Sequence, residues 1–512
     1  MLTQPVTAVP LPAPADTVTT KRQPAWPNRL WLLPVLVTAV LGLWRASSID
    51  LWWDELSTID IARRPFSGII ATAGHVDAVH TVYYLFMHVW IILFGASPIS
   101  VRLPSVLAMC GATACTAVIA EKLFDKRIGL TAAMIFALIP GVARYAQEAR
   151  SYGFVVLGAS AAFLLLLRAL EQPSPRRWKI YGAILALTGA LNLIALMAVV
   201  GHAVAVLVKA RAESDDPATR RRDYLRPFVL AVGVAVLIDL PVIVFGAFEA
   251  DSQLGDLSRA TVSDLPSMWK DIGNSAPFSL LVLLALPLLL SHRKRGPELT
   301  ILASATFPVV ALWFVSLFGV GFDSFARYLL FVLPVWAIAI AAAVDRLWPA
   351  RKAALIAVIL VTAVAVTYDQ LQIHGHLSHF KYDYPGASVL PEDYSAAAAI
   401  VHANYKAGDA GTFGQSVHIE LGVNEYLPAD EQLSDIFTQR TDAQENSLTP
   451  AYCTSTEACV DKAPDRVWML ETGFVAPYAV ERADWSLALM LQYRTVQVWH
   501  VWGITVTLLE RR

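Results

Sequence analysis

Long runs of apolar residues constrain this chain more than any other feature of its sequence. Runs of suitable length for crossing a lipid bilayer occur at about 30–45, 101–120, 128–143, 153–170, 178–192, 193–209, 227–247, 277–291, 299–319, 326–344 and 353–368. Charged residues make up only 16% of the chain, against about 25% in soluble domains. The sequence predicts a polytopic α-helical membrane protein with about 11 transmembrane helices, although 178–209 would also fit one long helix.

The charged residues divide the chain into two parts. Residues 369–512 hold 19 acidic and 9 basic residues, a net charge of −10, whereas the rest holds 23 and 31, a net charge of +8. We therefore expect a transmembrane domain over 30–368 and a soluble domain over 369–512. Residues 1–29, rich in Pro, Ala and Thr, predict a disordered cytoplasmic tail, with a cleaved signal peptide over 21–46 as the alternative.

Basic clusters indicate the orientation in the membrane. They lie at 122–127, 176–179, 211–226, 293–295 and 346–352, and they share one side if the N-terminus is cytoplasmic. Counting residues 82–95 as a span would move the first cluster to the outside. We therefore expect a helix at the outer interface there, and a long first outer loop over 46–100. The soluble domain would lie on the extracytoplasmic side of the plasma (inner) membrane.

The soluble domain is predicted to be a small α/β unit. Residues 393–405 predict a helix, 411–414 a strand, and 495–509 a strand or hairpin. Cys453 and Cys459 would form a disulfide in an oxidising compartment, whereas we interpret Cys110 and Cys115 as buried thiols. The sequence contains no Walker motif, Gly-rich phosphate loop or zinc-site pattern, so ATP-driven transport is unsupported.

An acidic pair, Asp54 and Glu55, follows the first apolar run by about nine residues and is flanked by tryptophans. A carboxylate at the headgroup level could act as general base toward a hydroxyl that attacks a lipid-borne sugar. The alternative is a solvated interfacial acid beside a belt of tryptophans.

Other polar groups are expected on the same side of the membrane. They are His80, Arg102, the cluster from 144 to 152, and Arg327. Charges this close to hydrocarbon are costly unless they are paired or solvated, so each is a candidate functional residue. For Arg102 the alternative is a side chain that snorkels to the interface.

The order of these motifs resembles the polytopic GT-C glycosyltransferases, in particular the bacterial family 39 members related to protein O-mannosyltransferases and to the lipid A aminoarabinose transferase. The resemblance is carried by the Asp-Glu pair, His80 with Tyr83 and Tyr84, RLPS at 102–105, QEARSY at 147–152 and RY at 327–328. It covers about residues 30–170 well and 320–345 moderately. It implies a polyprenyl-phosphate sugar donor, transfer with inversion on the outer face, and no nucleotide sugar.

The resemblance also implies roles for residues of this chain. Asp54 would be the catalytic base and Glu55 its supporting acid, and the transmembrane domain would be the catalytic domain. The substrate-binding residues would be His80, Tyr83, Arg102, Gln147, Glu148, Arg150, Tyr152, Arg327 and Tyr328, with His80 and Arg327 at the donor phosphate. No cofactor and no metal site are required, although some relatives use a divalent metal ion. Two departures from the family are Thr81–Val82, where prolines are usual, and Asn192, where many relatives carry His.

The expected partners are the donor lipid, carrying mannose or a similar sugar, and a lipid, glycan or protein acceptor of the cell envelope; nucleic acid is not expected. The main alternative is a lipid or polysaccharide transporter or flippase. It predicts inverted repeats and broken helices near mid-membrane, whereas the polar groups here gather at helix ends. An O-antigen ligase or polymerase would carry its main loop late in the chain, and a receptor would need the acidic domain but not Asp54.

Overall fold

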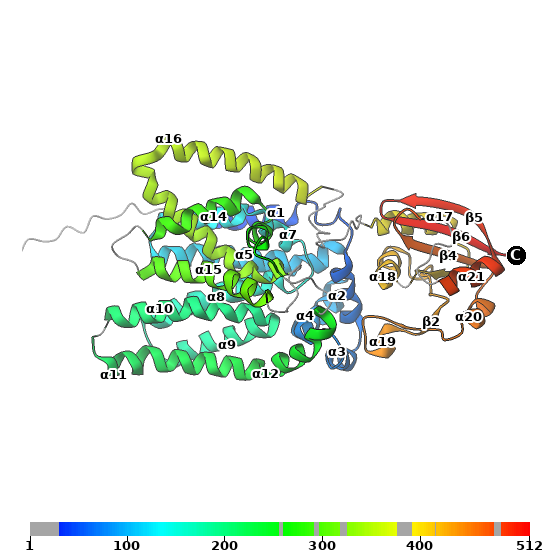
Figure 1. The fold of residues 1–512 in the computed structure, drawn as a ribbon, viewed down its shortest axis with the longest axis horizontal. Coiled ribbons are helices and arrows are strands. Elements are labelled where there is room, and N and C mark those ends of the chain that lie inside the picture. Colours follow the sequence, from blue (N-terminus) through cyan, green and yellow to red (C-terminus); the bar gives the residue numbers. More distant parts are fainter. Residues whose placement is uncertain are drawn as a thin grey trace, which may run out of the picture.

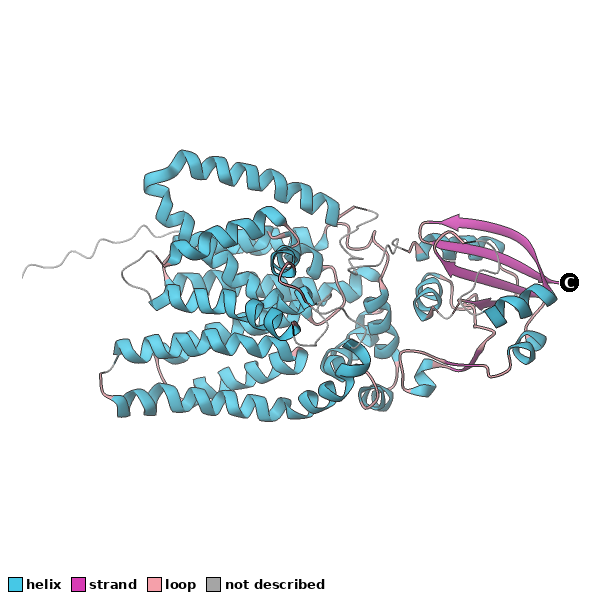
Figure 2. Ribbon diagram, in the orientation of Figure 1, coloured by secondary structure: helices cyan, strands magenta, loops and turns pink. Residues whose placement is uncertain are grey.

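The computed structural model describes residues 30–213, 215–254, 260–290, 296–317, 325–375, 392–414, 416–475 and 483–512. It has two parts, a bundle of helices and a C-terminal unit with a β-sheet (Figure 1, Figure 2). The predicted fold class, a polytopic helical protein with a small C-terminal α/β domain, is confirmed. The predicted tail over 1–29 and the basic cluster at 293–295 lie outside the described residues.

Within the described residues, each predicted apolar run is helical over most of its length. The helices are α1 (Leu32–Leu43), α5 (Pro98–Leu123), α6 (Lys126–Leu138), α7 (Pro140–Ala146), α8 (Tyr152–Glu171), α9 (Pro175–Leu191), α10 (Ala198–Glu213), α12 (Arg226–Leu254), α13 (Asp264–Gly273), α14 (Ala276–Leu289), α15 (Gly296–Ser316) and α16 (Leu333–Ile373). The run at 178–209 forms two helices. Asn192 follows α9, and its side chain accepts a hydrogen bond from the Ile194 N–H, which starts the 3-10 helix η2 (Leu193–Met197).

Six helices of the described residues are long and apolar enough to cross a membrane, or up to eight if each of two bent helix pairs is one span. Helix α16 has 41 residues, about 60 Å of helix, which is roughly twice the hydrocarbon thickness. It bends at Arg351, shortly after Pro349, and Figure 1 shows the chain turning back there. The predicted count of about 11 spans stays a prediction.

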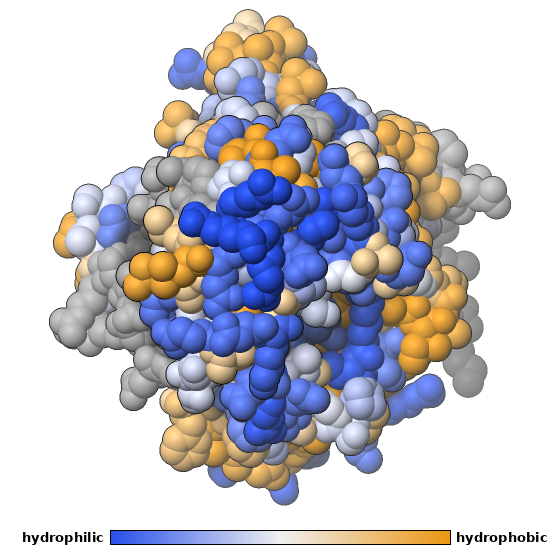
Figure 3. Space-filling view, turned by 90° about the vertical axis from the view of Figure 1, so that its right-hand side faces the viewer, coloured by the Kyte–Doolittle hydropathy of each residue, from blue (hydrophilic) through white to orange (hydrophobic). Residues whose placement is uncertain are grey.

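Apolar side chains cover much of the outside of the bundle. Leu237 on α12 is 66% exposed and Val364 on α16 is 72% exposed. Exposed apolar faces on several long helices are typical of a surface that lipid covers. Figure 3 views the molecule from the end that carries the C-terminal unit; hydrophilic residues dominate its centre, and hydrophobic residues gather at its margins.

Ion pairs join neighbouring helices at the end of the bundle away from the C-terminal unit. Lys122 at the end of α5 binds Glu171 at the end of α8 at 2.8 Å, and Arg346 of α16 binds Glu298 of α15 at 2.5 Å. Helix α11 (Pro217–Arg220), within the most basic cluster, also lies at this end (Figure 1). These basic loops therefore share one side, as the charge pattern predicts, and their cytoplasmic placement stays a prediction.

The predicted first outer loop folds into short helices at the opposite end of the bundle. These are α2 (Trp53–Arg63), α3 (Phe66–Ala73), the 3-10 helix η1 (Ala78–His80) and α4 (Thr81–Phe94), between the bundle and the C-terminal unit (Figure 1). Helix α4 is the helix predicted at 82–95. With 14 residues it is too short to cross a hydrocarbon core of about 30 Å. It ends at Gly95, whose φ of 75° an L-residue rarely adopts.

The C-terminal unit is built on a four-stranded sheet of order β1-β4-β6-β5. Strand β1 (Ala410–Thr412) pairs in parallel with β4 (Arg466–Thr472), and β6 (Ile504–Arg511) pairs antiparallel with both β4 and β5 (Tyr493–Val501). A second sheet pairs β2 (Thr438–Arg440) with β3 (Ala451–Tyr452). Helices α17 (Tyr394–Asn404), α18 (Val417–Tyr426), α19 (Asp442–Glu445), α20 (Thr456–Lys462) and α21 (Ala483–Gln492) complete the unit. The predicted helix, strand and terminal hairpin are confirmed.

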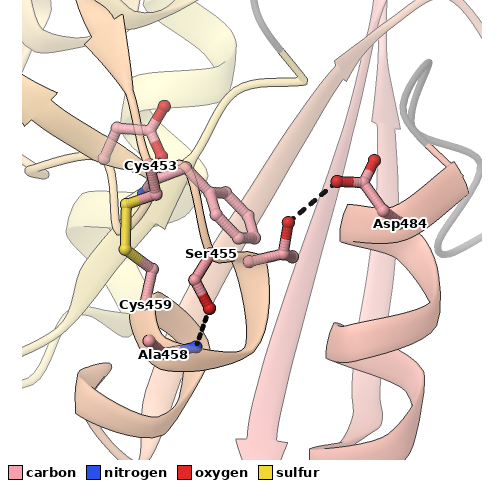
Figure 4. Close-up of a disulfide and its surroundings, with 8 residues drawn as sticks. Cys453, Ser455, Ala458, Cys459 and Asp484 are labelled. Atoms are coloured by element: carbon pink, nitrogen blue, oxygen red, sulfur yellow. Dashed lines mark hydrogen bonds between the residues drawn. A yellow bond between two sulfur atoms is a disulfide. The ribbon is translucent and has the colours of Figure 1, made fainter.

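Cys453 and Cys459 form the predicted disulfide (Figure 4). It closes the turn between β3 and α20, where the Ser455 hydroxyl accepts a hydrogen bond from the Ala458 N–H at 3.4 Å. Thr456 also donates to Asp484 of α21 at 2.8 Å. The disulfide therefore fixes a loop that is already held at two points. Cys110 and Cys115 are free thiols, half-buried where we expected full burial.

The C-terminal unit is docked on α2 through consecutive arginines. Arg63 forms an ion pair with Glu425 of α18 at 2.5 Å. Arg64 is buried and binds Asp60 at 2.7 Å and Asp442 of the C-terminal unit at 2.9 Å. Acidic groups outnumber Arg64 here. Burial and the nearby Asp442 raise the pKa of Asp60 to about 7, and burial together with neighbouring acids raises the pKa of Glu420 to about 8.

These raised pKa values predict that the free energy of unfolding falls as pH rises. The folded protein keeps protons on Asp60 and Glu420 that the unfolded chain releases near pH 4. The stability that these two groups contribute is therefore fully present below about pH 4 and is lost as the pH rises to about 8. We expect a lower melting temperature at pH 8.5 than at pH 5.5 in thermal unfolding. Glu420→Gln should flatten this dependence, and an unchanged slope in that variant would contradict the assignment.

Candidate active site

Asp54 lies between two arginines at the end of the bundle that faces the C-terminal unit. Its Oδ1 is 3.0 Å from an Nη of Arg150, and its Oδ2 accepts a hydrogen bond from Arg327 at 2.9 Å. The carboxylate is 21% exposed, so the site is open on one side. Burial alone would raise the pKa of Asp54, but the charges of Arg150 and Arg327 outweigh it and hold that pKa well below its usual range.

Three separate segments position these side chains. Asp54 is the second residue of α2, whose start is fixed because the Trp52 N–H donates to Glu55 at 3.3 Å. Arg150 lies in the tight connection between α7 and α8. Arg327 lies in the 3-10 helix η4 (Phe325–Val332), directly before α16. The predicted Asp54, Arg150 and Arg327 are therefore brought together although they are widely separated in the sequence.

A second layer of polar groups holds Arg150 from behind. Its guanidinium donates to the Tyr84 hydroxyl at 2.8 Å, and that hydroxyl donates in turn to Asp77. Asp77 also lies 3.7 Å from Arg150 and 3.8 Å from the Nε2 of His80. Burial lowers the pKa of His80 to about 4, although Asp77 opposes this shift. His80 is therefore neutral at neutral pH and is a weaker phosphate ligand than we expected from the sequence.

A buried acid and aromatic rings line the other side. Glu148 is 2% exposed, and burial raises its pKa to about 7 against the opposing charge of Arg144. Its Oε1 has no hydrogen-bond partner among the residues that the structure describes. The guanidinium of Arg327 lies 5.9 Å from the ring centre of Tyr152 and 5.4 Å from that of Tyr328. Glu148, Tyr152 and Tyr328 are thus grouped around Arg327.

Arg102, which we predicted to bind substrate, is enclosed by protein instead. It is fully buried and donates to Glu55 at 2.6 and 2.8 Å, and to the backbone carbonyl groups of Ala46, Ile49 and Asp50. Glu55 is equally buried and also accepts the Ala149 N–H at 3.0 Å. Neither side chain is accessible to a substrate. Glu55 is better described as a positioning residue that ties α2 to the connection carrying Arg150.

Gln147 and Tyr83, which we predicted to bind substrate, are buried in the walls of the site. Gln147 is fully buried, and its amide donates to the carbonyl groups of Trp44 at 2.7 Å and Leu41 at 3.4 Å, at the end of α1. Tyr83 is 1% exposed and packs edge-on against Phe154 with ring centres 5.8 Å apart. Both help to hold the walls of the site, and neither faces its opening.

A divalent metal ion would have to compete with two arginines at Asp54. Both carboxylate oxygens already bind guanidinium groups, which would repel a cation. No group of three or more His, Cys, Asp or Glu side chains suited to a metal was found over the described ranges.

The sequence did not indicate what the C-terminal unit adds to the site. Trp53, next to Asp54, donates to Glu392 at 2.9 Å and stacks on His418 of α18 with ring centres 4.6 Å apart. Neither Glu392 nor His418 lies in a recognisable motif, and each is more than 300 positions from Asp54 in the sequence. Asp77 and Tyr84, by contrast, lie next to predicted site residues in the sequence.

Known proteins resemble this chain in sequence and in fold. A sequence model of the family described as dolichyl-phosphate-mannose-protein mannosyltransferase matches residues 81–245, which include Tyr84 and Arg150 but neither Asp54 nor Arg327. No curated protein sequence matches the chain.

Two solved structures share its fold. ArnT from Cupriavidus metallidurans bound to undecaprenyl phosphate superposes with a TM-score of 0.63 at 14% identity, over 94% of this chain and 98% of that one. The same protein in the apo state gives a TM-score of 0.59 at 15% identity, over 93% and 97% of the two chains. The likeness therefore extends over the helices and the C-terminal unit together.

Proposed function

We propose that this chain, which has the GT-C fold, is a membrane glycosyltransferase that moves a sugar from a polyprenyl-phosphate donor to an acceptor hydroxyl. The observation that carries the proposal is the Asp54 carboxylate held between Arg150 and Arg327. It combines a proton acceptor with two fixed cations where a lipid-borne substrate could reach them. A flippase needs no such combination, which makes that alternative less favoured.

The donor phosphate would bind Arg150 and Arg327. Guanidinium groups suit phosphate because they can donate two parallel hydrogen bonds. The Nε atoms of both arginines are buried and have no hydrogen-bond partner within the described part of the chain. An anion at this position would satisfy these donors and would compete with Asp54 for the same two cations. Donor binding would therefore release the Asp54 carboxylate, raise its pKa and make it a better base.

The reaction we propose is a single displacement with inversion. The acceptor oxygen attacks the anomeric carbon while the bond from that carbon to the phosphate oxygen breaks. Asp54 takes the proton of the acceptor hydroxyl, and the polyprenyl phosphate leaves with the bonding electron pair, stabilised by Arg150 and Arg327. Glu148, Tyr152 and Tyr328 would face the sugar.

We also propose that the site lies on the outer face of the membrane, with a cytoplasmic N-terminus. This orientation is supported by the basic loops at the opposite end of the bundle. A mannose-like sugar is supported by the description of the matching family. The acceptor would be a lipid, glycan or protein of the cell envelope.

The donor class can be tested with membranes that contain the protein. They would be incubated with a labelled sugar carried either on polyprenyl phosphate or on a nucleotide. Conversion of the nucleotide sugar into the polyprenyl-phosphate sugar would be blocked, and the labelled product would be isolated. We expect label to move only from the lipid donor. Transfer from the nucleotide sugar alone would overturn the proposal.

A further inference from the structure

The C-terminal unit reaches the proposed site through one aromatic contact. His418, near the start of α18, stacks on Trp53 with ring centres 4.6 Å apart and planes 6° apart. The indole N–H of Trp53 donates to Glu392, a buried acid that also binds Tyr394 and Thr472 of the same unit. The Trp53 ring is therefore held at both its face and its edge by the C-terminal unit.

His418 stacks on Trp53, the residue directly before the proposed base Asp54. Burial lowers the pKa of His418, while Asp54 raises it and Arg150 lowers it further. The net effect is a neutral imidazole at neutral pH, with one ring nitrogen that donates and one that accepts hydrogen bonds. Its Nδ1 is buried and has no hydrogen-bond partner among the residues described.

Two other groups at this boundary are already occupied. The Arg63–Glu425 pair lies at the far end of α2, nine residues from Asp54, and Arg64 binds two carboxylates. Neither arginine is therefore available to bind a ligand at Asp54. His418 combines a stacked ring, an unused polar atom and proximity to Asp54.

We propose that His418 is an acceptor-positioning residue, which hydrogen-bonds the acceptor beside the hydroxyl that Asp54 deprotonates. The proposal rests on the function proposed above. It makes the C-terminal unit part of the acceptor site, whereas the donor phosphate contacts only residues of the bundle. The acceptor class it implies is a hydroxyl-bearing molecule with a second polar group close to the reacting oxygen.

His418→Phe tests this inference because it keeps the stack on Trp53 and removes both ring nitrogens. With membranes as the source of acceptor and a labelled polyprenyl-phosphate sugar, we expect transfer to fall on the order of tenfold, mainly through a higher KM for the membrane acceptor. Binding of undecaprenyl phosphate to the purified protein should stay within about twofold of wild type. His418→Gln, which retains hydrogen-bonding atoms, should recover part of the loss.

The matched control is His402→Ala, since His402 is an exposed histidine of the same unit that pairs with Glu431; it should transfer normally. Normal transfer by His418→Phe would overturn the inference. An equal loss of undecaprenyl phosphate binding would also overturn it, because the residue would then act through docking of the whole unit. Failure of the proposed function would be seen separately, as undiminished transfer by Asp54→Asn.

Discussion

Asp54→Asn is expected to abolish sugar transfer and, at the same time, to tighten the binding of undecaprenyl phosphate. The loss of transfer should be about 10²–10⁴-fold, because Asn cannot accept the proton of the acceptor hydroxyl. The gain in binding follows from the ion pairs of Asp54 with Arg150 and Arg327. A phosphate must displace the carboxylate in the wild type but meets two uncompensated cations in the variant. We expect a gain of roughly tenfold, about 1.4 kcal/mol.

Titration calorimetry with the purified protein would measure this affinity, and a labelled donor would measure transfer. Asp409→Asn is the matched control, since Asp409 also pairs with an arginine, Arg466, but within the C-terminal unit. It should change neither quantity. Weaker phosphate binding by Asp54→Asn would show that Arg150 and Arg327 do not form the phosphate site.

Arg102→Met is expected to be the most destabilising of the single substitutions considered. It leaves the fully buried Glu55 carboxylate without its cation, and breaking a buried pair in this way costs about 3–5 kcal/mol. Three backbone carbonyl groups between α1 and α2 also lose a donor. A fall in the melting temperature of the purified protein would measure this loss.

The comparison for this prediction is Lys122→Met, which breaks an ion pair with side chains 25% and 48% exposed. Its cost should stay below about 1 kcal/mol because water screens the pair. The double variant Arg102→Met with Glu55→Leu should regain part of the lost stability, since it removes the unpaired charge. If Arg102→Met and Lys122→Met melt at the same temperature, the proposed structural role of Arg102 is wrong.

Most of the fold could be predicted because it depends on local sequence pattern. The apolar runs predicted segments that lie in lipid and are therefore helical. The positions of the basic loops predicted that helix α4 is not a membrane span. The terminal hairpin followed from its alternating residues. Whether residues 178–209 form one helix or two could not be predicted. The break depends on the side chain of Asn192, and asparagine also occurs in the middle of helices.

The site was predicted less completely, because hydropathy does not specify the partner of a buried charge. A cation at the start of an apolar helix looks the same whether it binds a ligand or a distant carboxylate. Arg102 does the latter, with Glu55 47 positions away. For His80 the position could be predicted but not the degree of burial, which makes the imidazole neutral. His418 reaches the site only because the C-terminal unit docks on α2.

Three adjacent residues at the start of α2 have three unrelated partners: Trp53 contacts the C-terminal unit, Asp54 the two arginines, and Glu55 the buried Arg102. Successive residues of a helix point about 100° apart, so the three directions are fixed by the helical repeat. An insertion or deletion of one residue here would turn each side chain toward the wrong neighbour. Relatives that use the same arrangement should vary in length elsewhere but keep this tripeptide free of gaps.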